Sequence, residues 1–474
     1  MLLTERPALL PSGRYPHPMT RTRTALWMAL AISLSGCAST IPVTDTGVDV
    51  AVPSAWSVAA SAQPSDLARW WSRFNDPVLG DLVTQSLKSN TDVRVAQATL
   101  RQSRALRDVQ QGNNAPSLNA SASVQRSQTG SADAVNTYNV GLDASWELDV
   151  FGKQSHTLNA TAFDAQASQA SLADVQVSIA AEVALAYIQL RGQQAQLQIA
   201  RDNLASQQET LQLTQWRAQA GLVTSLEVEQ AQTSTEQTAA QVPALQTSIA
   251  KTSHSLAVLT GQSPNALQAL VSTPGPIPLA ANDLALDIPA QTLRQRPDVR
   301  AAEARIRAAL SRLSAADAAR YPSFNLSGSL GLSALSLSAF NGAPAVSSLL
   351  ASMTAPLLDG GAARAQVRVQ EAVLEQARVN YESTVLTALQ NVEDALVALS
   401  GDQSQLQRLQ AAATAAANAD LLARQRYASG LIDFQTVLQT QRTLLTAQDS
   451  VASTQATISA DHVRLFKALG GGWN

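Results

Sequence analysis

Residues 217–232 read RAQAGLVTSLEVEQAQ, and residues 426–441 read RYASGLIDFQTVLQTQ. Each stretch carries an arginine, a glycine four residues later, and then a mixed apolar and polar run. Other stretches pair in the same order: TDVRVAQATL from 91 with PDVRAAEARI from 297, APSLNASAS from 115 with YPSFNLSGS from 321, and LTG from 259 with LGG from 469. Because the offset between partners drifts only from 206 to 210 residues, the sequence predicts two copies of one unit of about 200 residues.

Residues 153–220 and 362–429 contain no proline, and each of these stretches is 68 residues long. Apolar residues recur in both at steps of three, four and seven, which predicts helices with one buried stripe. These positions are Val175, Ile179, Val183, Tyr187, Leu190, Leu197, Leu204 and Leu211, then Leu374, Tyr381, Val385, Leu389, Val392, Leu396 and Leu399. A continuous helix of that length spans roughly 100 Å. We expect helix to resume after Gly221 and Gly430 and to return, which makes two long antiparallel hairpins.

The N-terminal region predicts a lipoprotein signal in residues 1–36. Arg21 and Arg23 precede a short apolar run, residues 25–36, which is too short to span a membrane. The following Cys37 is the only cysteine, and LSGC resembles a bacterial lipobox, so we expect a covalent lipid on Cys37. A plain secretory signal with an incidental cysteine is the alternative. An aspartate directly after the lipidated cysteine retains such proteins in the inner membrane, and this chain has Ala38 there, which indicates the outer membrane. Met19 is the expected start of translation because residues 1–18 are rich in proline.

Between the first helix and the long hairpin, each half changes its apolar period to two. The alternating residues are Leu118, Ala120, Ala122 and Val124; Tyr138, Val140, Leu142, Ala144, Trp146 and Leu148; Phe324, Leu326, Leu330 and Leu332; and Leu349, Ala351, Met353, Ala355 and Leu357. Each run has about the length of a tilted transmembrane β-strand. Aromatic residues near the ends fit an interfacial girdle: Trp146, Phe151, Tyr321 and Phe324. A soluble β-hairpin with one solvent-exposed face has the same period. The predicted outer-membrane location favours transmembrane strands.

Four strands cannot close a barrel, and open strand edges are not tolerated in lipid. The sequence therefore predicts a homo-oligomer. The domain plan is a lipidated tether at 37–65, a first repeat at 66–271, a linker rich in proline at 272–290 and a second repeat at 291–472.

Composition excludes several classes of function. A net charge of −3 gives no basic footprint for nucleic acid. One cysteine and four scattered histidines lack the spacing of a metal site. No GxSxG, Walker loop or HExxH motif occurs. We therefore expect no enzyme, no metal and no cofactor apart from the lipid on Cys37.

The chain resembles outer-membrane efflux proteins of the TolC-like family, in their NodT-type lipoprotein branch. The resemblance rests on WWSRFNDPVL from 70, SWELDVFGK from 145, LRQRPDVRAAEARIRAA from 293, YPSFNLSGSLG from 321, PLLDGGAARAQV from 356, RYASGLIDF from 426 and FKALGGGW from 466. It implies a mixed α/β membrane protein, a homotrimer whose 12-stranded β-barrel continues as a periplasmic α-helical barrel. It also implies a passive exit duct in the outer membrane of a Gram-negative bacterium, for drugs, dyes or small metabolites. A periplasmic adaptor and an inner-membrane pump would be the partners.

The resemblance also assigns roles near the two glycines. The glycine ends would be the periplasmic mouth, where the adaptor docks, with Arg217, Gly221, Arg426, Tyr427 and Gly430 as docking residues. Ordinary turn packing is the alternative for each of them. Several members carry an acidic ring nine residues after the second glycine, and this chain has Gln439 there instead.

Gln435 lies one turn before Gln439, and Asp433 is the nearest carboxylate. Glutamines narrow an aperture without concentrating cations, so we expect weaker cation selectivity than an acidic ring gives.

Two other functions fit parts of the pattern. The same channel could serve a type I protein secretion system, which the sequence does not separate from efflux. A periplasmic adaptor lipoprotein is more remote, because adaptors carry one helical hairpin and this chain has two.

Overall fold

The computed structural model describes residue 56, residues 69–280 and residues 290–471. The predicted signal, Met19, Cys37 and most of the tether lie outside the described residues. So do residues 281–289 of the predicted linker.

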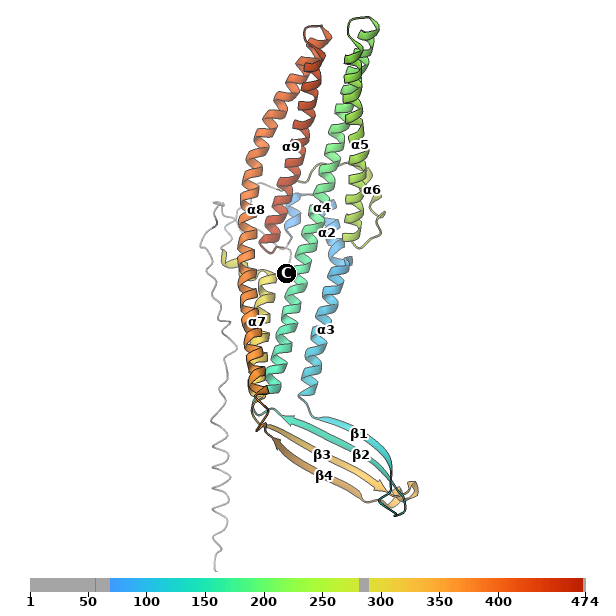
Figure 1. The fold of residues 1–474 in the computed structure, drawn as a ribbon, viewed down its shortest axis with the longest axis vertical. Helices are drawn as coiled ribbons and strands as arrows, with labels where there is room; N and C mark the ends of the chain where they lie inside the picture. The colour runs from blue at the N-terminus through green and yellow to red at the C-terminus, as the bar shows by residue number, and fades with distance from the viewer. Residues whose placement is uncertain (1–55, 57–68, 281–289, 472–474) are drawn as a thin grey trace, which may run out of the picture. The chain divides into compact units, whose positions relative to one another are not determined.

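The described chain repeats a shared order of helix, two strands, long helix and return helix (Figure 1). The first half contains η1 (Trp70–Phe74), α2 (Pro77–Ser89), α3 (Thr91–Asn113), β1 (Ser117–Ser127), β2 (Val135–Leu148), α4 (Lys153–Gln219), α5 (Ser225–Leu259) and α6 (Gln268–Ser272). The second half contains η2 (Ala290–Gln295), α7 (Pro297–Ala318), β3 (Ser323–Ala334), η3 (Leu337–Gly342), β4 (Ala345–Thr354), α8 (Ala362–Ala428) and α9 (Phe434–Ala468). The duplication, the two long helices and their return helices are confirmed.

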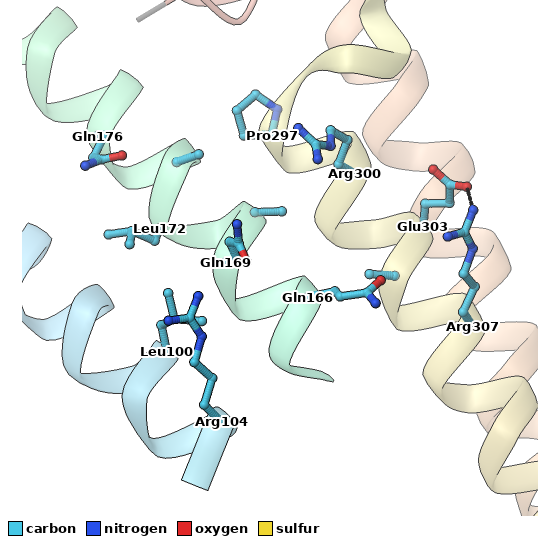
Figure 2. A pocket seen from close by; sticks show the side chains of 13 residues that line it. Leu100, Arg104, Gln166, Gln169, Leu172, Gln176, Pro297, Arg300, Glu303 and Arg307 are labelled. Atoms are coloured by element: carbon cyan, nitrogen blue, oxygen red, sulfur yellow. Dashed lines mark hydrogen bonds and ion pairs between the residues drawn. The ribbon is translucent and has the colours of Figure 1, made fainter. Parts of the chain in front are cut away.

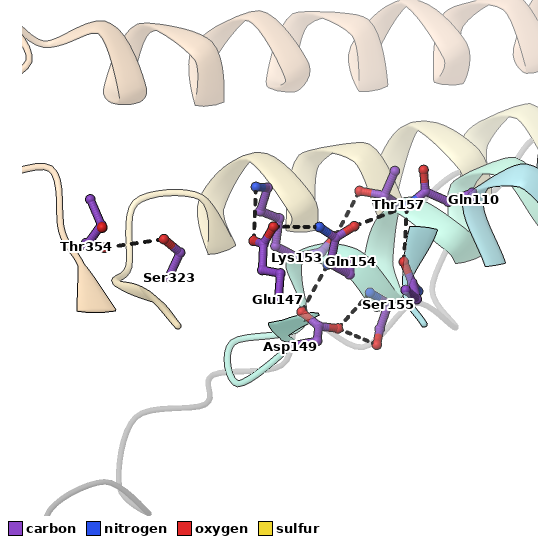
Figure 3. A network of polar contacts seen from close by, with 10 residues as sticks. Gln110, Glu147, Asp149, Lys153, Gln154, Ser155, Thr157, Ser323 and Thr354 are labelled. Carbon is purple, nitrogen blue, oxygen red and sulfur yellow. Dashed lines mark hydrogen bonds and ion pairs between the residues drawn. The ribbon is translucent and has the colours of Figure 1, made fainter. Parts of the chain in front are cut away.

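The long helices begin with matching caps. Gly152 and Gly361 precede α4 and α8 with φ of 80° and 86°. The Asp149 carboxylate accepts hydrogen bonds from the backbone N–H of Gln154 at 3.0 Å and of Ser155 at 2.7 Å (Figure 3). Asp359 likewise accepts from two backbone N–H groups before and within α8. A carboxylate at these positions satisfies N–H groups that have no partner in the helix.

Helix α4 forms the centre of the packing, in contact with α2, α3, α5, α7 and α9. Its predicted stripe is buried in the middle of the helix, at Ile179, Val183, Tyr187 and Leu190. Within the described part of the chain, α4 alone is long and apolar enough to cross a membrane by composition. Because α4 contacts five helices, its apolar segment is explained by packing in the protein core.

The strands form one antiparallel sheet in the order β1-β2-β3-β4. Directly opposite residues share a face, so Ala120, Leu142 and Leu330 lie together on the apolar face. Gly141 pairs with Gly331 on the other face, where a Cβ at Gly331 would lie 3.0 Å from the Val140 carbonyl oxygen. The predicted alternation is confirmed, except that Ala355 and Leu357 follow the end of β4.

Candidate functional site

The two turns between the long helices and their return helices have the same backbone. We call residues 217–225 the first tip and residues 426–434 the second tip. Gly221 has φ of 74° and Gly430 has φ of 72°, a left-handed conformation that side chains rarely adopt. The N–H of the next residue donates to the arginine carbonyl four residues before the glycine, at 2.9 Å in both tips. This is the Schellman closure of a helix end.

The second tip has an aromatic core of its own. The Tyr427 and Phe434 rings lie 5.4 Å apart between centroids. Their exposed fractions are 4% and 1%, and they pack with Val437 and Leu438 of α9. Tyr427, which the sequence predicts as a docking residue, therefore faces inward in the single chain.

Arg217 joins the first tip to the second. Its Nη1 donates to the Tyr427 carbonyl oxygen at 2.7 Å, and its guanidinium carbon lies 4.6 Å from the centre of the Tyr427 ring. Both contacts favour the cation, by hydrogen bonding and by the ring quadrupole. The equivalent Arg426 is exposed. The two predicted arginines thus have different surroundings.

The predicted aperture residues lie at the start of α9. Asp433 is its N-cap and accepts hydrogen bonds from the Thr436 hydroxyl at 2.6 Å and the Thr436 N–H at 2.8 Å. These bonds hold the pKa of the Asp433 carboxyl below its ordinary value. Gln435 and Gln439 lie one turn apart and are exposed, whereas Phe434 is buried.

A polar contact line beneath the tips has no counterpart in the sequence predictions. The Gln441 side-chain amide donates to the Thr210 hydroxyl at 3.0 Å, and the Asn203 amide donates to the Gln448 carbonyl oxygen at 2.8 Å. These polar side chains join α4 to α9 at positions seven residues apart on each helix. The spacing of seven residues was the one signal in the sequence for these contacts. It does not distinguish these polar residues from the other polar residues of the two helices.

Exposed apolar side chains also surround the tips. Leu222 is 70% exposed and Leu431 is 73% exposed, and Trp216 and Leu226 are exposed as well. Such a group marks a contact surface more often than isolated exposed residues do.

The four predicted interfacial aromatics lie where the sheet meets the helices. Phe151 stacks on Tyr321 at 5.0 Å, and Phe324 lies 6.4 Å from Phe151. The Trp146 indole donates to the Asn114 carbonyl oxygen at 3.2 Å. Three of the rings thus contact one another, the fourth makes a hydrogen bond, and all four lie near the end of a strand.

Among the described residues, no group of three or more acidic, histidine or cysteine side chains could hold a metal ion. The tips combine capped helix ends, exposed leucines and exposed glutamines. This arrangement can form a contact surface and a polar rim.

A sequence profile of the family described as "Outer membrane efflux protein" matches residues 82–262 and 288–471. The pyoverdine export outer membrane protein OpmQ of Pseudomonas aeruginosa is 31% identical over 460 residues, which cover 94% of this chain and 96% of OpmQ. The toluene efflux pump outer membrane protein TtgF of Pseudomonas putida is 31% identical, with 95% and 97% covered. The solved structure of the outer-membrane channel OprN has a TM-score of 0.81 and 34% identity, with 90% of this chain and 99% of OprN covered.

These matches span both halves, including the strands, the long hairpins and both tips. The chain belongs to the outer membrane efflux protein family and is a non-enzymatic channel of efflux pumps, which lies in the outer membrane and extends into the periplasm.

Proposed function

We propose that three copies of this chain form one exit duct for small organic molecules, delivered by an inner-membrane pump through a periplasmic adaptor. The open edges of the sheet carry this proposal. Within the described residues, β1 and β4 each pair with one strand only. Because lipid offers no partner for free N–H and C=O groups, the edges must pair with other copies. The names of the relatives, which mention pyoverdine and toluene, support small organic cargo.

Two measurements test the assembly and the cargo separately. Native mass spectrometry of the purified full chain should give three times the protomer mass, and a monomer or dimer would contradict the trimer. Cells that lack the gene should accumulate more of a fluorescent efflux dye, and the intact gene should restore the lower level. Normal dye levels together with retention of a secreted protein would favour protein secretion instead.

The exposed leucines of the tips are proposed as the adaptor contact. Leu222→Ser with Leu431→Ser should raise dye accumulation toward the level of the deletion strain while the trimer mass is unchanged. The adaptor should also fail to co-purify with this variant. Wild-type efflux by the double variant would exclude these side chains from docking. Arg217, Arg426, Gly221 and Gly430 would act by shaping and flanking this surface.

Gln435 and Gln439 are proposed to line the periplasmic aperture, with Asp433 as a helix cap beside it. Gln439→Asp should raise the preference of the channel for cations at least about twofold, because three added carboxylates would meet near the axis. Conductance in planar bilayers under a salt gradient measures this ratio. Gln405→Asp, an exposed glutamine on α8 far from the tips, is the control. Equal effects of both variants would contradict the assignment.

Cys37 is proposed as the lipid anchor of the mature chain. Cells that express the full chain should incorporate labelled palmitate, and Cys37→Ser should remove the label. Label on the serine variant would exclude this residue as the attachment point.

A further inference from the structure

A cavity of ≈ 450 Å³ lies between α3, α4 and α7, away from the tips. Figure 2 shows the side chains of all three helices that line it. Its charged residues are Arg104 of α3 and Arg300, Glu303 and Arg307 of α7. The volume is within the range of small-molecule sites in proteins.

The charges around this cavity are unbalanced. Three arginines and one glutamate line it; Glu303 accepts a hydrogen bond from Arg307 at 2.5 Å, and Arg300 has a contact of its own. Within the described part of the chain, no carboxylate lies within salt-bridge distance of Arg104. A concave surface with an excess of one sign of charge concentrates ions of the opposite sign.

The uncharged lining adds two kinds of contact. Gln166 and Gln169 of α4 lie between Arg104 and the arginines of α7, where their amides can donate hydrogen bonds (Figure 2). Leu100 and Leu172 supply apolar surface. The matching ligand has acidic groups on an apolar body. Guanidinium groups recognise carboxylates, sulfonates and phosphates through paired N–H donors.

The position of the cavity indicates that its ligand is a soluble anion and not a lipid headgroup. Arg104 precedes the end of α3, at Asn113, by roughly 14 Å of helix, and Arg307 precedes the end of α7, at Ala318, by roughly 16 Å. The strands begin only after these ends. A headgroup layer is about 5 to 7 Å thick, so headgroups of the bilayer do not reach the arginines.

We propose that this cavity binds a soluble organic anion with an apolar body. Binding belongs to the wall of the single chain, so the inference goes beyond the exit-duct function and does not require the pump. It would hold even if the proposed cargo or adaptor were wrong.

Isothermal titration of the purified full chain with naphthalene-1,5-disulfonate, in neutral detergent at low salt, tests the site. Wild type should bind one disulfonate per chain, and Arg104→Gln or Arg300→Gln should each weaken binding about fivefold or more. Glu303→Gln should strengthen binding, because it releases Arg307. Arg94→Gln, an exposed arginine on α3 outside the cavity, should bind as wild type does.

Three outcomes would overturn the proposal. These are the absence of a heat of binding with wild type, wild-type affinity in the double variant of Arg104 and Arg300, and equally tight binding of an uncharged naphthalene. Thermal unfolding of each variant checks that the fold is intact. In a competition arm, dihexanoylphosphatidylglycerol below its micelle concentration should displace the disulfonate no better than glycerol 3-phosphate. Displacement at tenfold lower lipid concentration would assign the cavity to lipid and reject the soluble anion.

Discussion

The first and second tips share a backbone and differ in what they bury. Their glycines have nearly equal φ, and the same closing hydrogen bond measures 2.9 Å in each. The second tip places Tyr427 and Phe434 in a core, where the first has Ala218 and Ser225. Asp433 caps α9 with its side chain, whereas Thr224 makes no such bond to α5. The duplication has therefore preserved the backbone of the turn. The second tip is stabilised by its own buried side chains, whereas the first tip has no such core and contacts the second.

The strongest test of this difference is removal of the second core. Phe434→Ala deletes a buried ring and should reduce the local opening free energy of the second tip by about 3 kcal/mol or more. The counterpart Ser225→Ala should change the first tip by no more than about 0.5 kcal/mol. Hydrogen exchange of amides in both tips measures these energies. Similar changes in both tips would mean that the aromatic core does not distinguish them.

The return helices α5 and α9 extend the comparison to their far ends. His462 of α9 is 2% exposed, and its counterpart on α5 is the buried Ser253. Burial, together with the positive charge of Arg73, lowers the pKa of His462 to about 4.

The unfolded chain takes up this proton near pH 6.5, so stability falls as pH decreases from 6.5 toward 4. Between pH 7 and pH 5 the loss should be about 2 kcal/mol. His462→Ser should show a thermal unfolding midpoint that shifts less with pH than that of wild type. Parallel pH curves for the two proteins would contradict the role of His462.

Arg217 connects the tips, so its removal should disturb the second tip as much as the first. Arg217→Gln loses the bond to the Tyr427 carbonyl and the contact with its ring, at a cost of about 1 kcal/mol. Faster hydrogen exchange should appear around Tyr427, which belongs to the other hairpin. Arg426→Gln, at the equivalent exposed arginine, should leave the first tip unchanged. A response confined to the first tip in Arg217→Gln would show that the two tips open independently.

The smallest expected effect concerns the cap of α9. Asp433→Ala should speed exchange of the Thr436 amide several-fold, and Thr224→Asp should slow exchange in the first turn of α5 by giving it a comparable cap. The pKa of Asp433 is lowered in the folded chain, so its contribution is complete above the unfolded pKa and disappears as pH falls through the folded value. In wild type the Thr436 amide should therefore lose protection in acid. Unchanged protection there would exclude the carboxylate as the cap.

Local patterns predicted most of the fold. The stretches without proline place α4 and α8 within one residue of their ends, and the period of two finds all four strands. The LTG and LGG pairing was displaced by one residue, because the left-handed glycines that end α5 and α9 are Gly261 and Gly470. The end of β4 was overestimated, since alternation continues into a segment without pairing partners.

The site was less predictable than the fold. Sequence places Arg217 and Tyr427 at the tips, but contact between residues so far apart depends on how the two hairpins pack. The polar line through Thr210 and Gln441 was missed because a glutamine in a helix interface and one facing water have the same sequence pattern. The charged cavity between α3, α4 and α7 was missed because its residues come from three segments.

The uniform length of the hairpins has a consequence for how this chain tolerates insertions and deletions. The boundaries of α8 and α9 each lie 209 residues after those of α4 and α5, at 153 and 362, 219 and 428, 225 and 434, and 259 and 468. One inserted residue would turn every later side chain of a helix by about 100°, and so exchange packed and solvent-facing positions. Length changes between the two copies have accordingly accumulated before the long hairpins, in the strands and loops. Loop tips such as those between β1 and β2 are therefore the places to insert a tag or epitope.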